Sequence, residues 1–259
     1  MNVRDRKLGQ MPPWVAWLLM LFMFTCVFRI ADAETVYVGV ATNFRNTMQR
    51  LIQAFERTHP DRIVASYAST GKLYAQIRHG APFQIFLAAD ARRPKQLIQD
   101  GLALAASRQT YALGRLVLWQ PKATEPINSL SALGQFKRLA MANPKTAPYG
   151  VAAQQVLRAL HGDHDLPERI LGENIAQTFQ FVGSGNVPVG FVALSQALSQ
   201  AIPEADYWLV PQAYYAPIVQ QSVVLTAASG QPAVRRFYAY LSAHETKRMI
   251  QEQGYGVVE

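Results

Sequence analysis

The chain has 259 residues, 50% of them hydrophobic and 16% charged, which is an ordinary globular composition with ample material for a core. Its formal net charge is +8, but the basic residues form no run and do not alternate with aromatic residues, which argues against nucleic acid as a partner. A mild positive field of this kind helps to attract a small anion.

The first 33 residues have the three parts of a secretory signal peptide. A basic segment at residues 4–7 precedes an apolar run at residues 14–28, and an A-x-A cleavage site follows from Ala31 to Ala33. The apolar run is shorter than the roughly 20 residues of a membrane-spanning helix, which favours a cleaved signal over an uncleaved anchor. We therefore expect residues 1–33 to be removed and the mature protein, starting at Glu34, to be periplasmic.

The only cysteine, Cys26, lies inside this signal segment. Lipidation of Cys26 is the alternative to cleavage after Ala33, although Phe24 and Thr25 make a poor lipobox, whose residue next to the cysteine is small. The remainder of the chain contains no other cysteine, so no disulfide is expected.

The first predicted strand leads directly into a helix. Every second residue of 36–40 is valine, which predicts a strand with one apolar face. Thr42 and Asn43, two helix-capping residue types, follow it, and a helical pattern begins at Phe44. A helix N-terminus carries unpaired N–H groups and about half a positive elementary charge, so it is a suitable place for an anion. The alternative is that Thr42 or Asn43 simply caps its own helix.

Three further turns lead from a strand or loop into a helix and offer similar groups. They contain Ser69-Thr70-Gly71, Pro148-Tyr149-Gly150 and Asn174-Ile175. Together the four turns provide hydroxyls, amides and free backbone N–H groups, all of them neutral donors. Such a site can bind a dianion, and it suits a carrier because no buried ion pair traps the ligand.

Two long predicted strands, at residues 111–120 and 218–226, stand out from an alternation of shorter strands and helices. The alternation predicts an α/β fold with open, mostly parallel sheets flanked by helices, and the long strands are expected to cross between two lobes. The expected division is a signal peptide at 1–33, a discontinuous lobe I at 34–113 and 219–259, and lobe II at 114–218. In such architectures, ligands bind in the crevice at the carboxyl ends of the strands.

Signals for an enzyme are weak. The sequence contains no G-x-S-x-G, H-E-x-x-H or P-loop motif and no visible pair of nucleophile and base. Asp90 follows a short strand and could be a catalytic carboxylate, but a cap for the helix near Pro94 is the favoured interpretation. We therefore expect a protein that is not an enzyme. The alternative is an exported hydrolase that acts on a small anionic substrate.

Two other features have a simple structural interpretation. Residues 161–165 read His-Gly-Asp-His-Asp, but a solvated loop is favoured over a metal site because the two histidines lack a helical frame. Five aromatic residues are expected in the core or at its rim rather than in a platform for sugar stacking. They are Phe44, Tyr111, Trp119, Tyr214 and Tyr215.

Six short motifs resemble, in order and spacing, those of the periplasmic molybdate-binding proteins of ABC importers. They are A-T-N-F at 41–44, S-T-G-K-L at 69–73, G-A-P at 80–82, A-A-D at 88–90, N-P and A-P-Y-G within 143–150, and G-F-V-A at 190–193. The resemblance covers essentially all of residues 34–259. It implies the two-lobed periplasmic binding protein fold (type II) with two crossover strands. It also implies a receptor that captures molybdate, and tungstate as well, for delivery to a membrane permease.

The resemblance further implies which residues contact the oxyanion. Carried over by position, they are Thr42, Asn43, Thr70 with Ser69 beside it, Tyr149, and Ile175 through its backbone. No cofactor is implied, and molybdenum enters the site only as the oxyanion. A monomer without a nucleic-acid partner is expected.

The chain departs from the family pattern at three positions of the site. Many relatives have a serine where Asn43 stands. Many also have a tyrosine where Ala193 stands, whose hydroxyl touches the ion, and an alanine where Tyr149 stands. The Tyr149 hydroxyl would then replace the missing one from the other side of the cleft. The preference between molybdate and tungstate stays open, and a receptor of the same fold for another anion is an alternative function.

Overall fold

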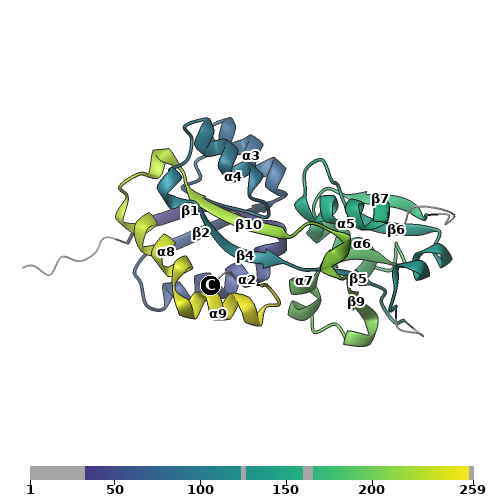
Figure 1. Cartoon of the computed structure of the whole chain (residues 1–259). Helices are drawn as coiled ribbons and strands as arrows, with labels where there is room; N and C mark the ends of the chain where they lie inside the picture. The colour runs from purple at the N-terminus through teal and green to yellow at the C-terminus, as the bar shows by residue number, and fades with distance from the viewer. Residues whose placement is uncertain (1–32, 124–126, 160–165, 257–259) are drawn as a thin grey trace, which may run out of the picture. The chain divides into compact units, whose positions relative to one another are not determined.

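Two five-stranded sheets form the framework of the structure (Figure 1). The structure is a computed structural model that describes residues 33–123, 127–159 and 166–256. Residues 1–32 of the predicted signal peptide, with Cys26, and residues 161–165, for which a solvated loop is predicted, lie outside these ranges. None of the helices within the ranges combines the length and the hydropathy that spanning a bilayer requires.

The first sheet has the strand order β2-β1-β3-β10-β4. Its strands are β1 (Thr35–Ala41), β2 (Arg62–Ala68), β3 (Ile85–Ala88), β4 (Gln109–Gly114) and β10 (Ile218–Val224). β1 pairs in parallel with β2 and β3, whereas β10 is antiparallel to β3 and β4.

The second sheet has the strand order β7-β6-β8-β5-β9. Its strands are β5 (Leu116–Trp119), β6 (Arg138–Ala142), β7 (Glu168–Gly172), β8 (Gly190–Ala193) and β9 (Tyr207–Leu209). β6 is parallel to β7 and β8, whereas β5 is antiparallel to β8 and β9.

The predicted α/β class with mostly parallel sheets is confirmed, because four of the five strands in each sheet run in the same direction and only β10 and β5 run against them. In each sheet, half of the strand pairings are antiparallel. The physical reason is the route of the chain. β5 enters the second sheet directly from the first, and β10 enters the first sheet from the second, and each of them runs against its neighbours.

Helices cover both faces of each sheet. The α-helices are α2 (Arg45–Glu56), α3 (Thr70–Arg78), α4 (Arg92–Gln99), α5 (Pro148–Ala159), α6 (Ile175–Gly183), α7 (Leu194–Ser199), α8 (Pro232–Ser242) and α9 (His244–Glu252). Short 3-10 helices are η1 (Thr42–Phe44), η2 (Ala105–Ser107), η3 (Leu130–Gln135), η4 (Glu204–Asp206), η5 (Gln212–Tyr214) and η6 (Thr226–Ala228).

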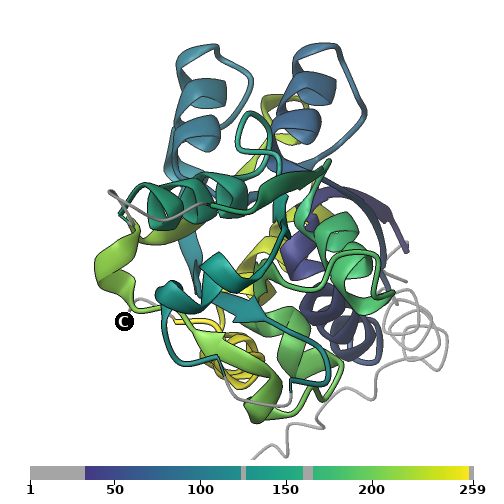
Figure 2. The ribbon, with the colours of Figure 1, turned by 90° about the vertical axis from the view of Figure 1, so that its right-hand side faces the viewer.

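Alternation along the strands decides which helices each face meets. In β1, the three valines of residues 36–40 are fully buried in one cluster with residues of α2, α8 and α9. The opposite face of the first sheet meets α3 and α4, which lie side by side at the top of Figure 2. In the second sheet, α5 packs on one face and α6 and α7 pack on the other.

The chain passes between the two sheets twice. Only Arg115 separates Gly114, the last residue of β4, from the first residue of β5. The predicted long strand at 111–120 is therefore two strands in two sheets. The return runs through residues 210–217, and β10 lies wholly in the first sheet. The lobe limits themselves stay a prediction.

Candidate functional site

The six residues implied by the resemblance line one small cavity. Its walls consist of Ala41, Thr42, Asn43, Ser69, Thr70, Ala89, Ala147, Pro148, Tyr149 and Ile175. The space not filled by atoms is about 190 Å³. Part of this space is open to solvent, and the enclosed part has about the size of one water molecule, so the cavity is too small for a sugar.

The cavity lies where strands of both sheets end and helices begin. On the side of the first sheet, the cavity is lined by residues at the ends of β1, β2 and β3. On the side of the second sheet, it is lined by the first turns of α5 and α6. The carboxyl ends of the strands and the helix N-termini therefore meet at one place, which is the location expected for a ligand in α/β architectures. All six implied residues are less than a tenth exposed.

Asn43 does not cap its own helix. Neither η1 nor α2 has a side-chain cap, and the Nδ2 amide of Asn43 instead donates to Gln220 Oε1 at 2.8 Å and to Tyr255 Oη at 3.2 Å. Both hydrogens of the amide are thus in use. The donor that Asn43 can offer to the cavity is its backbone N–H, which belongs to the first turn of a helix and has no partner within that helix.

Ser69 and Thr70 present two hydroxyls at the start of α3. The Ser69 hydroxyl accepts from the backbone N–H of Lys72 at 3.4 Å, and Thr70 Oγ1 accepts from the backbone N–H of Ala89 at 3.0 Å. Each oxygen therefore acts as an acceptor toward the protein. Each hydroxyl proton remains available for an anion in the cavity.

Tyr149 reaches the cavity from the first turn of α5 and is 2% exposed. Its Oη accepts from Gln220 Nε2 at 3.3 Å, so its own proton is not used in that bond. Burial raises the pKa of the Tyr149 hydroxyl well above its usual value. Tyr149 is therefore a neutral hydrogen-bond donor at neutral pH.

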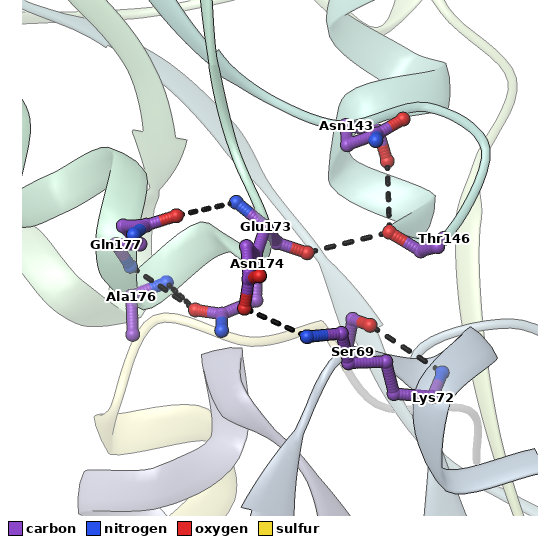
Figure 3. Close-up of polar contacts among 8 residues, drawn as sticks. All are labelled: Ser69, Lys72, Asn143, Thr146, Glu173, Asn174, Ala176 and Gln177. Atoms are coloured by element: carbon purple, nitrogen blue, oxygen red, sulfur yellow. Dashed lines mark hydrogen bonds and ion pairs between the residues drawn. The ribbon is translucent and has the colours of Figure 1, made fainter.

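Ile175 is the first residue of α6, and its environment leaves its N–H free. Asn174 Oδ1 caps the helix by accepting from the N–H groups of Ala176 and Gln177, both at 3.0 Å (Figure 3). The cap does not include the N–H of Ile175, which belongs to the first turn and lines the cavity. Gln196 Nε2 donates to the Ile175 carbonyl at 3.1 Å and holds this turn in place.

Contacts beside the cavity join elements of the two sheets. The N–H of Gly71 donates to the Thr146 carbonyl at 2.9 Å, and Arg93 Nη2 donates to the Lys145 carbonyl at 3.3 Å. Lys72 Nζ lies 2.7 Å from Glu173 Oε2 (Figure 3), with both side chains about half exposed. Glu173 is thus paired outside the cavity, and among the described residues no carboxylate lines it.

The other residues considered for chemistry have structural roles. Asp90 accepts from the backbone N–H of Arg93 at 2.9 Å and pairs with its guanidinium, so the predicted cap of this helix is confirmed. Of the five aromatic residues, four are buried, and Tyr214 is partly exposed; none of them lines the cavity among the described residues. Within the same ranges, no group of histidine, cysteine and carboxylate side chains could hold a metal ion.

A buried polar network behind the cavity was not predicted from the sequence. Gln220 of β10 is fully buried and bonds Asn43, Tyr111 and Tyr149. Tyr255 donates to the Asn43 carbonyl at 2.8 Å. Nothing in the local pattern of β10 distinguishes Gln220 from Gln221 beside it, so the signal in the sequence was too weak to find it.

The fold and the lining of the cavity are typical of a binding protein for a small ligand. The chain belongs to the family of bacterial extracellular solute-binding proteins, whose model matches residues 36–256. Within the family, it is similar to the molybdate-binding protein ModA of Azotobacter vinelandii, with 40% identity over 231 residues, 88% of this chain and 92% of the relative.

Two further relatives agree with this assignment. The molybdate-binding protein ModA of Rhodobacter capsulatus is 35% identical over 227 residues, which are 87% of this chain and 89% of the relative. The solved structure of the periplasmic molybdate-binding protein of Azotobacter vinelandii matches with a TM-score of 0.78 and 32% identity. The match covers 86% of this chain and the whole of that one, so the predicted periplasmic binding protein fold is confirmed.

Proposed function

We propose that this protein is a periplasmic receptor that binds molybdate, and tungstate as well, and delivers it to the permease of an ABC importer. The observation that carries the proposal is the cavity in which hydroxyls and backbone N–H groups meet without any carboxylate among the described residues. The names of the relatives, which are molybdate-binding proteins, support the choice of ion.

The proposed contacts follow from the free donors. The hydroxyls of Thr42, Ser69, Thr70 and Tyr149 and the backbone N–H groups of Asn43 and Ile175 would surround the four oxygens of the ion. Hydrogen bonds to a charged acceptor contribute more than those to a neutral one, about 1.5–3 kcal/mol each. Neutral donors would also let the ion leave when the two halves of the protein open, as in hinge-type binding proteins.

The donor set also defines which ions are rejected. Hydrogen phosphate carries a proton that would find no acceptor, at a cost of about 1–3 kcal/mol. Sulfate carries no proton, but its shorter bonds would leave some oxygens out of reach of the donors. Among the residues that the structure describes, the lining has no nucleophile with a base beside it, which favours a receptor over a hydrolase.

Calorimetric titration of residues 34–259 with molybdate, tungstate, sulfate and phosphate tests this function. We expect tight binding of molybdate and tungstate, weak binding of sulfate and the weakest binding of phosphate. Phosphate binding as tight as molybdate binding would overturn the proposal, since it would require an acceptor in the cavity. Mass spectrometry of the exported protein tests cleavage after Ala33, and sedimentation tests the expected monomer.

A further inference from the structure

Two consecutive carbonyls of the loop between β6 and α5 accept from donors that belong to the first sheet. The Lys145 carbonyl accepts from Arg93 Nη2 at 3.3 Å, and the Thr146 carbonyl accepts from the N–H of Gly71 at 2.9 Å. A Cβ on Gly71 would lie 3.0 Å from both Arg93 Nη2 and Thr146 O, so the two donors stand side by side. The loop is therefore held to the first sheet at two neighbouring points.

The turn at residues 143–147 uses its own N–H groups internally. The N–H of Lys145 donates to Asn143 Oδ1 at 3.0 Å, and the N–H groups of Thr146 and Ala147 donate to the Asn143 carbonyl at 3.1 and 2.9 Å. The carbonyls of Lys145 and Thr146 find their partners outside the turn, on the first sheet. Since a backbone carbonyl away from water needs a donor, these two contacts are part of how the loop is satisfied.

Arg93 is prepared for its contact by Asp90. Asp90 Oδ1 accepts from the backbone N–H of Arg93 at 2.9 Å, and Asp90 Oδ2 pairs with Arg93 Nη1. Because the guanidinium is a planar fork, fixing Nη1 also fixes the direction of Nη2, which faces the Lys145 carbonyl. The Arg93 side chain is 8% exposed, so water hardly competes for this donor.

The contact lies beside the cavity. Arg93 and Lys145 line a larger hollow, whose walls come from the start of α4, the β6–α5 loop, α5 and residues 216–219. Ala89 and Pro148 line both this hollow and the cavity, so the two spaces adjoin. The bond from Arg93 to Lys145 therefore bridges the hollow next to the cavity.

We propose that Arg93 is a positioning residue that fastens the β6–α5 loop to the first sheet in the closed, ion-bound form and so slows release of the oxyanion. The proposal rests on the proposed function and deepens it. Arg93 lies outside the described lining of the cavity, so it acts through the loop, which leads into Ala147 and Pro148 on the cavity wall.

The effect is confined to the closed form. Donor and acceptor belong to different sheets, so a hinge motion that separates the sheets breaks the bond. In the open form, Arg93 Nη2 and the Lys145 carbonyl both bond to water instead. Loss of the bond therefore destabilises the closed form alone, and a change of this kind alters the dissociation rate more than the association rate.

Arg93→Lys tests the proposal. A lysine ammonium can still pair with Asp90, but it lacks the fork that reaches the Lys145 carbonyl at the same time. Release of radiolabelled molybdate into an excess of unlabelled molybdate, followed by rapid filtration, gives the dissociation rate. We expect release that is roughly five- to tenfold faster than in the natural protein. The association rate and the melting temperature of the empty protein should change little, whereas a merely structural role would lower that melting temperature.

Arg92→Lys is the matched control. Arg92 precedes Arg93 in α4, is exposed and lines the same hollow, so the same chemical change there leaves the contact in place. This variant should release molybdate at the natural rate.

The outcomes are separable. A natural release rate in Arg93→Lys would overturn the role of Arg93, while tight binding of molybdate by the natural protein would leave the proposed function intact. Faster release together with a clearly lower melting temperature of the empty protein would also overturn the role. Absence of binding in the natural protein would overturn the function and the role together. If Arg93→Lys does not fold, Asp90→Asn replaces it, because it frees the guanidinium from its anchor. Faster release would then support the proposal, and an unchanged rate would refute it.

Discussion

The backbone N–H of Gly71, in the first turn of α3, donates to the carbonyl of Thr146 at 2.9 Å. This bond joins the strand-to-helix turn after β2 to the loop that leads from β6 into α5. A donor at a helix N-terminus has no partner within its own helix, so the bond satisfies a group that would otherwise need water. It closes one rim of the cavity.

Gly71→Ala should weaken molybdate binding without harming the fold. A Cβ at this position would lie 3.0 Å from both Thr146 O and Arg93 Nη2, which opposes the approach of the two segments. We expect a loss of roughly five- to tenfold in affinity, the equivalent of one hydrogen bond of about 1 kcal/mol. Calorimetry measures the loss, and thermal unfolding of the empty protein should change little. Gly134→Ala, which meets no atom within 4 Å, is the control, and equal affinity in both variants would contradict the prediction.

Thr70→Ala should weaken binding more than Ser69→Ala. The Thr70 hydroxyl is held by the N–H of Ala89 at 3.0 Å, whereas the Ser69 hydroxyl has a longer contact of 3.4 Å with Lys72 N. A donor held in place in advance contributes more to binding, so we expect a loss of about tenfold or more for Thr70→Ala. Thr70→Ala also leaves the buried N–H of Ala89 unpaired and should lower the melting temperature of the empty protein. Unchanged calorimetric affinity of Thr70→Ala would rule out this role.

Molybdate affinity should be nearly constant between about pH 6 and 8, since the described residues that line the cavity include no histidine, carboxylate or amine that would change its charge in that range. Burial raises the pKa of Tyr149 well above its usual value, so its hydroxyl keeps its proton, and keeps donating, throughout this range. Calorimetry at three pH values in buffers of equal ionic strength measures this. A tenfold change per pH unit would reveal a titrating group in contact with the ion.

The ion pair between Asp61 and Arg236 should make stability depend on pH. Arg236 Nε and Nη2 each donate to one Asp61 oxygen at 2.7 Å, and these bonds lower the pKa of Asp61. A lowered pKa means that the stabilisation is present above the unfolded-state pKa of about 3.9 and is lost as the pH falls through the folded-state pKa. Arg236→Gln should therefore lose about 1–3 kcal/mol at pH 7.

Thermal unfolding from pH 7 down to pH 3 measures this dependence. The difference between Arg236→Gln and the natural protein should shrink as the pH falls below about 4. Arg235→Gln is the matched control, because Arg235 is exposed and its guanidinium donates to the carbonyl of Gly230 at 3.3 Å. A difference that stays constant across this range would mean that the guanidinium acts through packing.

Local patterns predicted much of the fold and of the cavity. The alternating valines of residues 36–40 specified β1, and the capping residue types after β1 and β2 pointed to the turns that meet at the cavity. The residue pattern also marked the turns that contain Tyr149 and Ile175, and the resemblance assigned these two residues to the oxyanion; their contact with an ion stays a prediction.

Long-range relationships were not readable from the sequence. Asn43 and Gln220 are 177 residues apart, and the register of β10 shifts between Gln220 and Gln221, so no local pattern tells which glutamine faces inward. Strand direction was not readable from the sequence either. The antiparallel pairings of β5 and β10 follow from the two passages between the sheets, and local propensity contains no information about them.

The exposed pair of Lys72 and Glu173 has a consequence for the empty protein. An ion pair with side chains 47% and 61% exposed contributes little free energy, and salt weakens it further. This ion pair therefore adds little to hold an empty cavity shut, and under the proposed function the bound ion supplies part of the free energy of closure. Under the proposed function, the closed shape then reports occupancy. A partner that recognises only this shape would ignore empty receptors, even where they outnumber the loaded ones.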